Sequence, residues 1–397
     1  MNVCHSRYLL GFDNNSGDGV VRCLIQRNII IMQKICLIYN LAQHYRSEIF
    51  QQLDQNFDVD FYFGDKYLDV KKMDYSLLKG KVEEVHNGKI GPFLYQTKVL
   101  SLLRKYDVFL MIGETHSITT WMFMFLSKLF PKKRVYFWCH GWYGKETKVE
   151  KFLKHILDKM PAGLFVYGNY AKLLMIKEGF DESKLHVIHN SLAYSKQLEI
   201  RKHLVLNSLY KDHFGNEEAP VLMFVGRLDP VKKLDMILTA MSICKQRGQN
   251  YNLIIIGGGQ EVEKLKALTE ELALTDRVWF YGPCYDECVL GNLIYNSDIC
   301  IAPGNIGLTA MHCMVFGTPA ITHNCFKWQM PEFEAIKDGK TGTFFAMDDV
   351  QSLSDSINRW FAINKDRREE VRKNCMNEID TQWTPEFQMN VFKQHLK

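Results

Sequence analysis

Short apolar runs alternate with helical patterns along this chain from Lys34 onward. Each run has the length and the β-branched or aromatic content of a buried strand, and apolar residues recur at helical spacing between most of the runs. Consecutive strands that are joined by helices need crossover connections, which produce parallel sheets. The strand patterns of the first half are KICLIYN, FDVDFYFG, DVFLMIG, RVYFWCHG, GLFVYG and LHVIHN. The alternation therefore predicts an α/β fold.

A polar segment at 193–219 interrupts the alternation, which restarts with VLMFVG at 221–226 and continues through NLIIIGGG, VWFYG, ICIAPG, PAITH and GTFF. With 397 residues, the chain also exceeds what one hydrophobic core usually serves. We therefore predict two Rossmann-like domains, at 32–200 and 201–383, that face each other across a cleft. Ligands of parallel sheets bind outside the carboxyl ends of the strands, so we expect the functional residues there.

The two ends of the chain depart from this pattern. Residues 1–31 fit poorly with the strand and helix patterns of the remaining chain, and a second methionine, Met32, directly precedes the first strand pattern. We predict that 1–31 is an extension outside the fold. At the other end a Trp-Thr-Pro break at Pro385 interrupts the helical pattern, so 384–397 is predicted to be a separate helix that packs back on the first domain.

Composition narrows the class of protein. The 47% of hydrophobic residues exclude a mostly disordered chain. A net charge of +4 is too small to favour nucleic acid, although it suits an anionic substrate or membrane surface. Eleven cysteines without a CxxC pair predict reduced thiols in a cytoplasmic protein. The sequence has no run of about 20 apolar residues that predicts a transmembrane helix, and no secretory signal pattern.

Two cations follow the first strand pattern of the second half. Gly226 permits a sharp exit from VLMFV, and Arg227 and Lys232 stand in the next turn. A guanidinium fork and a compact ammonium at the carboxyl end of a strand suit a diphosphate, and ordinary surface charges on a solvated loop are the alternative. The three glycines of IIIGGGQ let the backbone approach a ligand, but they do not form the GxGxxG dinucleotide fingerprint.

A third candidate site follows the strand pattern ICIA. Residues 303–305 lead to a predicted helix at 306–316, whose N-terminal amides would bind an anion. His312 lies inside this helix, where a packing role is the alternative to a binding role.

The segment 221–345 resembles the C-terminal domain of the family-4 retaining glycosyltransferases, which have the GT-B fold. The resemblance rests on segments in the family's order, which are VGRLDPVKK, the glycine-rich turn, DRVWFYG, SDICIAPG, GLTAMHCMVFGTPAIT and EAIKDGKTG. In the N-terminal half AQHYRSEIF, FWCHGW and VIHNSL resemble the acceptor-side domain more weakly, so that the resemblance covers roughly 34–395.

The resemblance implies transfer of a sugar from a nucleotide diphosphate sugar to an acceptor hydroxyl, with retention of anomeric configuration. It implies that Arg227 and Lys232 bind the diphosphate in catalysis and that His140 lies near the reacting sugar. The donor-binding residues that it implies are Gly226, Arg227, Lys232, Gly257, Gly258, Gly304, Asn305, Ile306, Gly307, Leu308 and His312. No metal or other cofactor is expected, because positive side chains replace the cation. The expected acceptor is a glycan or a lipid-linked saccharide of surface polysaccharide or glycolipid biosynthesis.

Two positions depart from the family pattern. The family motif has two glutamates separated by seven residues, and the aligned positions here are Gly304 and His312. A neutral imidazole can still exchange hydrogen bonds with a ribose, whereas Gly304 offers only backbone. The missing glutamates suggest a catalytically silent subunit that binds sugar nucleotides as one alternative function. A nucleotide-sugar epimerase is the other alternative, because it can use the same architecture, although it needs acidic groups in the cleft.

Three other patterns concern the first domain. Glu114, His116 and His140 follow strand patterns and are the predicted acceptor-side residues. The DVD at 58–60 matches a metal motif of another glycosyltransferase fold, but it lies inside a predicted strand, and we expect no metal there. The apolar stretch 118–134 ends in basic residues and is either a core helix or a segment that touches the inner face of the cell membrane.

Overall fold

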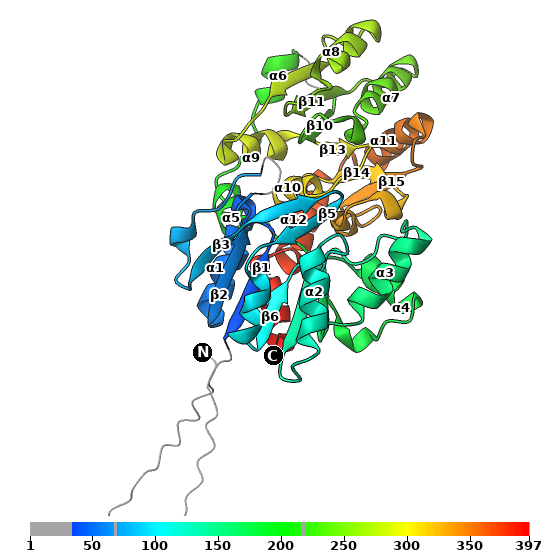
Figure 1. Ribbon diagram of the computed structural model, residues 1–397. Helices are drawn as coiled ribbons and strands as arrows, with labels where there is room; N and C mark the ends of the chain where they lie inside the picture. The colour runs from blue at the N-terminus through cyan, green and yellow to red at the C-terminus, as the bar shows by residue number, and fades with distance from the viewer. Residues whose placement is uncertain (1–33, 67–69, 216–218, 397) are drawn as a thin grey trace, which may run out of the picture. The chain divides into compact units, whose positions relative to one another are not determined.

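Two parallel sheets form the framework of the protein (Figure 1). The computed structural model describes residues 34–66, 70–215 and 219–396, which all belong to one compact unit. The predicted extension at 1–31 lies outside the described residues. The prediction of an α/β fold with two Rossmann-like parallel sheets is confirmed.

The first sheet has seven strands. Their order is β3 (Val82–Val85), β2 (Val59–Gly64), β1 (Ile35–Tyr39), β6 (Val108–Met111), β7 (Arg134–Cys139), β8 (Gly163–Val166) and β9 (Leu185–Val187). The helices of this half of the chain are α1 (Ser47–Asn56), α2 (Ile118–Ser127), α3 (Lys148–Asp158) and α4 (Asn169–Lys177). A hairpin of β4 (Asn87–Ile90) and β5 (Phe93–Gln96), with Gly91 at a φ of 57° in its turn, was not predicted.

Both faces of the first sheet are buried, which explains its continuous apolar runs. In β1, Ile35 and Leu37 contribute to one core, whereas Cys36 and Ile38 contribute to the core on the opposite face. Side chains of α2, α3 and α4 belong to the core that contains Cys36, and side chains of α1 belong to the other core. Helices α2 and α3 therefore cover the same face of the sheet.

The second sheet has six strands. Their order is β12 (Val278–Gly282), β11 (Asn252–Ile256), β10 (Val221–Val225), β13 (Ile299–Ala302), β14 (Ala320–His323) and β15 (Gly342–Phe345). Its helices are α7 (Asp235–Gln246), α8 (Val262–Glu271), α9 (Glu287–Asn296), α10 (Thr309–Val315), α11 (Val350–Asn364) and α12 (Arg368–Gln382). The polar segment between the sheets contains α5 (Tyr194–Arg201) and α6 (Leu209–Phe214).

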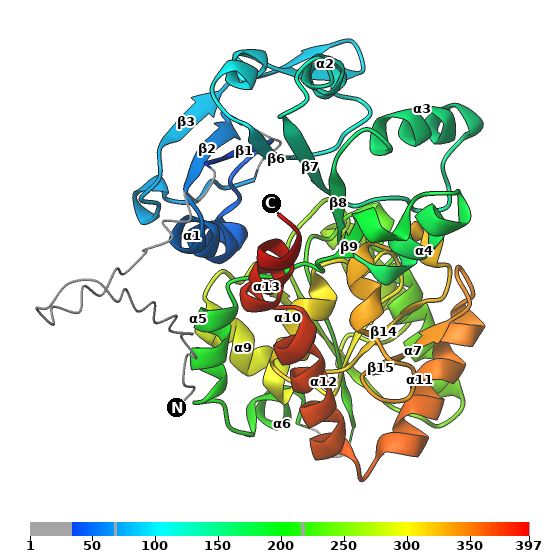
Figure 2. The same cartoon turned by 90° about the horizontal axis from the view of Figure 1, so that it is seen from below.

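The last helix, α13 (Pro385–His395), returns to the first sheet (Figure 2). Its start is capped by Thr384, whose Oγ1 accepts a hydrogen bond from the Phe387 N–H. The Phe392 ring centroid lies 5.1 Å from that of Trp138 in β7 and 4.7 Å from that of Phe165 in β8. The chain end therefore contributes to the core of the first sheet.

His189 is buried between the two sheets and α13. Its ring centroid lies 4.3 Å from that of Trp383 and 5.6 Å from that of Phe387. Its backbone has a left-handed φ of 53°. Burial lowers the pKa of His189 to about 4, so the ring is neutral at pH 7.

We expect the protein to lose stability as the pH falls below the ordinary histidine pKa of 6.5. The unfolded chain binds a proton near this pH, whereas folded His189 binds one only near pH 4, so protons favour unfolding between the two values. For His189 alone the loss from pH 7 to pH 5 is about 2 kcal/mol. His189→Asn, whose side chain tolerates the left-handed backbone, should flatten the pH dependence of the free energy of unfolding in urea titrations. A dependence as steep as that of the wild type would contradict the prediction.

Candidate functional site

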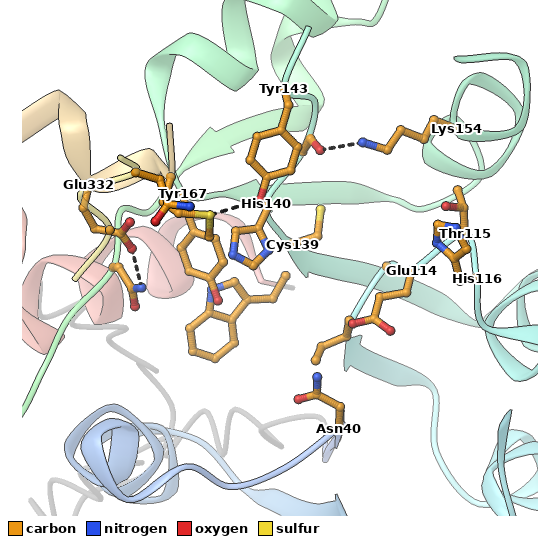
Figure 3. A pocket seen from close by; sticks show the side chains of 18 of the residues that line it. Asn40, Glu114, Thr115, His116, Cys139, His140, Tyr143, Lys154, Tyr167 and Glu332 are labelled. Carbon is orange, nitrogen blue, oxygen red and sulfur yellow. Dashed lines mark hydrogen bonds between the residues drawn. The ribbon is translucent and has the colours of Figure 1, made fainter. Parts of the chain in front are cut away.

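The carboxyl ends of strands from both sheets line one cleft of about 980 Å³. The first sheet contributes Asn40, Glu114, Cys139, His140, Tyr167 and Asn190, and the second contributes Lys232, Asn305, Gly307, Leu308 and Glu332. Figure 3 shows His140, Tyr167 and Glu332 in this lining. A ligand that fills this cleft would touch residues of both sheets. The volume of the cleft suits a molecule of nucleotide-sugar size.

Lys232 is the cation that reaches the cleft from the second sheet. Its Nζ donates hydrogen bonds to the backbone oxygen and to Oδ1 of Asn305, both at 2.8 Å. Within the described part of the chain no carboxylate forms an ion pair with this Nζ. Burial lowers the pKa of Lys232, and the charges of Asp229 and Glu332 offset part of this effect. A part-buried ammonium whose hydrogen-bond partners are neutral favours an anionic ligand.

Arg227 does not line the cleft. Its side chain is 72% exposed, and its Nε lies 3.9 Å from Asp229 Oδ2. The structure thus separates the two predicted diphosphate cations, placing Lys232 in the cleft wall and Arg227 in solvent. A role of Arg227 in diphosphate binding stays a prediction.

The glycines after β10 and β11 allow two loops to pack closely together. A Cβ at Gly257 would lie 1.9 Å from the Gly226 carbonyl oxygen, and one at Gly259 would lie 2.4 Å from the Leu228 carbonyl oxygen. The Leu228 N–H donates to the Gly258 carbonyl at 2.9 Å. This approach of backbone to backbone accounts for the triple glycine. Gly226, Gly257 and Gly258 do not line the cleft, and their part in donor binding stays a prediction.

Gly304 is required by the turn that carries Lys232. A Cβ at Gly304 would lie 2.0 Å from the Val231 carbonyl oxygen and 2.9 Å from the Lys232 Cα. A glutamate at this position would therefore displace the turn that holds the ammonium in the cleft wall.

The predicted helix at 306–316 begins three residues later than expected, as α10 at Thr309. Gly307 has a φ of 52°, which is outside the helical region, and the Ile306 N–H donates to Gln329 Oε1 at 3.0 Å. Ile306 is buried and does not line the cleft. The Ile306 amide is therefore not free for an anion.

His312 also lies outside the cleft lining. Its Nδ1 is 3.3 Å from Gln197 Nε2 of α5, and burial lowers the pKa of the imidazole. The hydrogen bond to α5 gives this histidine a packing role. Its contact with a ribose stays a prediction.

All three predicted acceptor-side residues line the cleft, as Figure 3 shows. The His140 ring centroid lies 4.9 Å from that of Tyr167. His140 is exposed to the open cleft. Desolvation by the surrounding cleft wall, followed by the positive charges of Arg46 and Lys154, lowers the pKa of its ring, which is therefore neutral at pH 7. Burial raises the pKa of Glu114, and His116 offsets part of this shift.

A chain of hydrogen bonds joins the two sheets inside the cleft, and none of its members was predicted. Arg46 Nη2 donates to Asn190 Oδ1 at 2.9 Å, and Asn190 Nδ2 donates to Glu332 Oε1 at 2.9 Å. Arg46 lies in AQHYRSEIF and Asn190 in VIHNSL, so the weak resemblance of these motifs was the available signal. Glu332 lies in no motif or strand pattern of the sequence, so nothing in the sequence indicated it.

Glu332 has spare hydrogen-bonding capacity. Its side chain is 3% exposed, and its Oε2 has no hydrogen-bond partner among the described residues. Burial raises the pKa of Glu332, and the bond from Asn190 and the charges of Arg46 and Lys232 offset part of the shift. This oxygen is itself buried, and a buried carboxylate oxygen without a partner, beside a cleft, favours a polar group that reaches it.

Two residues further on, Glu334 caps a helix of the other sheet. Its carboxylate accepts hydrogen bonds from the backbone N–H groups of Asn169 and Tyr170, both at 2.7 Å, at the start of α4. Gly168 precedes this helix and leaves room, because a Cβ there would lie 2.3 Å from Glu334 Oε1. The second sheet thus supplies the cap that α4 lacks in its own sequence.

The DVD motif has a structural role in the described chain. Asp60 accepts a hydrogen bond from Tyr106 and forms an ion pair with Lys34 at 3.0 Å. The described residues contain no group of three or more His, Cys, Asp or Glu side chains placed to hold a metal ion. The nine cysteines in these parts of the chain are free thiols.

Residues 208–377 match the family model described as Glycosyl transferases group 1. An uncharacterized 41.2 kDa protein in the cps region of Klebsiella pneumoniae is 24% identical over 243 residues, which cover 57% of this chain and 63% of that protein. Alpha-D-kanosaminyltransferase of Streptomyces kanamyceticus is 22% identical over 152 residues, or 38% of each chain. The matches span less than two thirds of the length of these curated relatives.

Solved structures resemble nearly the whole chain. The crystal structure of Anabaena Alr3699/HepE in complex with UDP matches with a TM-score of 0.65 and 15% identity, and covers 91% of this chain and 98% of that one. The apo form of the lipopolysaccharide outer core galactosyltransferase WaaB matches with a TM-score of 0.66 and 17% identity, with the same coverage. The chain therefore has the GT-B fold, and residues 208–377 in its second half are similar to the glycosyltransferase group 1 family.

We expect Glu334→Gln to destabilise the protein by about 1–3 kcal/mol, because an amide nitrogen would face backbone donors that a carboxylate oxygen now satisfies. The free energy of unfolding in urea measures the change. Glu263→Gln, an exposed position whose partner is Lys266 three residues along the same helix, is the control and should change stability by less than about 0.5 kcal/mol. Equal effects of the two substitutions would show that the cap contributes nothing.

Proposed function

We propose that this protein is a glycosyltransferase that moves a sugar from a nucleotide diphosphate sugar to an acceptor hydroxyl. The observation that carries the proposal is the part-buried ammonium of Lys232, which faces the cleft with neutral hydrogen-bond partners at the carboxyl edge of the second sheet. The group 1 domain and the sugar-transferring relatives support the same activity. The proposed acceptor is a glycan or a lipid-linked saccharide, and the proposed location is the cytoplasm.

The proposed chemistry needs stabilisation of charge more than a catalytic base. The bond between the anomeric carbon and the diphosphate breaks, and its electron pair stays on the phosphate oxygen, where Lys232 balances the growing negative charge. The acceptor oxygen bonds to the anomeric carbon from the same face, and its proton passes to the leaving phosphate. This route gives retention, as the resemblance implies. His140 is neutral at pH 7 and acts as a hydrogen-bond partner of the reacting sugar.

We assign Glu332 to the donor sugar. Gly304 cannot carry the family glutamate, whereas Glu332 lines the same cleft and has an unpartnered oxygen. A carboxyl group bonds a sugar hydroxyl in either protonation state, since a hydroxyl both donates and accepts. Asn190 orients this carboxyl from the first sheet, at 2.9 Å.

Incubation of the full chain with UDP- and GDP-sugars tests the proposal. Release of nucleoside diphosphate, without isomerisation of the remaining donor, supports transfer or slow donor hydrolysis. An isomerised donor would instead identify an epimerase. Absence of binding to every nucleotide in calorimetry would overturn the assignment and favour a silent subunit.

We expect Lys232→Met to weaken binding of the nucleoside diphosphate by about 10- to 100-fold, because a charge-assisted contact is lost from a buried site. Calorimetry with UDP and GDP measures the dissociation constant. Lys233→Met is the matched control, because the Lys233 side chain pairs with Asp348 and does not line the cleft. Unchanged affinity of the Lys232 variant would remove the proposed donor site.

Glu332→Gln should affect recognition of the sugar and spare that of the nucleotide. We expect kcat/KM for the nucleotide sugar to fall about tenfold or more while the affinity for the free nucleoside diphosphate stays within about twofold. Glu334→Gln is the comparison, because Glu334 lies in the same short 3-10 helix, Pro331–Ala335. This substitution should reduce stability without lowering kcat/KM for the nucleotide sugar relative to the affinity for the nucleoside diphosphate. A parallel loss of nucleotide and nucleotide-sugar affinity in Glu332→Gln would contradict the role.

A further inference from the structure

Helix α3 is amphipathic, but its apolar side faces solvent. Val149, Phe152, Leu153 and Ile156 recur at helical spacing and are all exposed, with Val149 at 68% and Phe152 at 66%. A capping box stabilises the first turn of α3, in which Thr147 and Glu150 exchange hydrogen bonds. An apolar stripe on a surface helix normally faces the core, so this orientation needs another explanation.

The opposite side of α3 is polar and lines the cleft. Glu150, Lys154 and Asp158 follow one another at four-residue spacing and belong to the cleft wall. Lys154 Nζ donates to Glu146 at 2.8 Å and to the Gly141 carbonyl at 3.1 Å. These contacts fix the rotation of the helix, and they leave its apolar side in solvent.

Helix α2 and the turn after it present a second apolar stripe. Met122, Phe125, Leu126, Leu129 and Phe130 are exposed at helical spacing, with Phe125 at 57% and Leu129 at 72%. Because α2 and α3 cover the same face of the first sheet, both stripes lie on its outer side. Their carboxyl ends meet, since Lys128 Nζ, just after α2, donates to the Met160 carbonyl, just after α3, at 2.6 Å. We call these exposed side chains the α2–α3 surface.

Positive charge is concentrated around the α2–α3 surface. The segment from Lys128 to Lys159 contains nine Lys and Arg and three Asp and Glu. Of these cations Lys133 pairs with Asp107 and Lys151 with Glu178, whereas Lys145 and Lys154 line the cleft. Lys132 and Lys148 are exposed, while Glu146 is paired with Lys154 and Asp158 is buried. Apolar side chains bordered by lysines match the interface of a bilayer with anionic headgroups.

We propose that the α2–α3 surface docks on an anionic lipid bilayer. The aromatic and aliphatic side chains enter the interface, and the surrounding lysines contact the headgroups. In the described part of the chain no helix is long and apolar enough to cross a membrane, so this contact is peripheral. If the proposed glycosyl transfer is correct, the polar side of α3 then holds the acceptor side of the cleft next to the bilayer, which suits a lipid-linked acceptor.

Sedimentation of the full chain with sucrose-loaded vesicles tests the docking surface without using donor chemistry. Vesicles of phosphatidylcholine alone are compared with vesicles that also contain phosphatidylglycerol, at low and high salt. We expect binding to the anionic vesicles that weakens as salt rises. The double variant Phe125→Ser, Phe152→Ser should weaken this binding about tenfold or more.

A matched control uses two residues of the same exposure elsewhere in the chain. Ile363 in α11 is 57% exposed and Val205 is 66% exposed, so the control variant Val205→Ser, Ile363→Ser removes equally exposed apolar side chains. We expect it to bind anionic vesicles like the wild type. UDP affinity, measured without vesicles, should be the same in both double variants, so failure of the docking surface and failure of the donor site are distinguishable.

Three results would overturn the proposal. One is absence of binding to anionic vesicles, and another is equal weakening by the two double variants. The third is a concentration-dependent dimer in light scattering without lipid that Phe125→Ser, Phe152→Ser abolishes, because the α2–α3 surface would then be covered by a second copy of the chain.

Discussion

Parallel strand pairing is the constraint on which the site depends. In a parallel sheet every strand ends at the same edge, so each sheet presents the residues that come after its strands along one line. His140, Tyr167 and Asn190 gather in this way at the edge of the first sheet, and Lys232 and Glu332 at that of the second. The hydrogen bonds from Arg46 through Asn190 to Glu332, and from α4 to Glu334, then connect the two edges directly.

Close backbone packing in the second sheet explains why the cleft wall contains the ammonium of Lys232 and why position 304 carries no side chain. The turn that carries Lys232 lies so near Gly304 that no side chain fits there. The ammonium is thereby held against neutral oxygens of Asn305, and no carboxylate of the described residues pairs with it directly, which favours an anionic ligand. A carboxyl group reaches the cleft from another segment, as Glu332, and its hydrogen bond with the first sheet couples the site to the relative position of the sheets.

The two sides of helix α3 face different environments, the cleft and the solvent. Its polar side satisfies charges in the cleft wall through Lys154, and its apolar side is left exposed as a geometric consequence. Residues such as Phe152 would be costly on a surface that always faced water, and their proximity to the basic residues gives them a partner in the proposed bilayer contact. The proposed chemistry and the proposed location of the enzyme therefore depend on the rotation of one helix.

The sequence by itself determined the class of fold, because period and length of its apolar runs follow directly from burial on both faces of parallel sheets. It also located the strand ends, and thereby Lys232, Asn305 and His140 in the cleft. Only the tertiary structure showed that Arg227 and His312 lie outside the cleft lining, and that Glu332 enters it. Contacts such as Asn190 with Glu332, between residues far apart in sequence, depend on packing that leaves no local periodic signal.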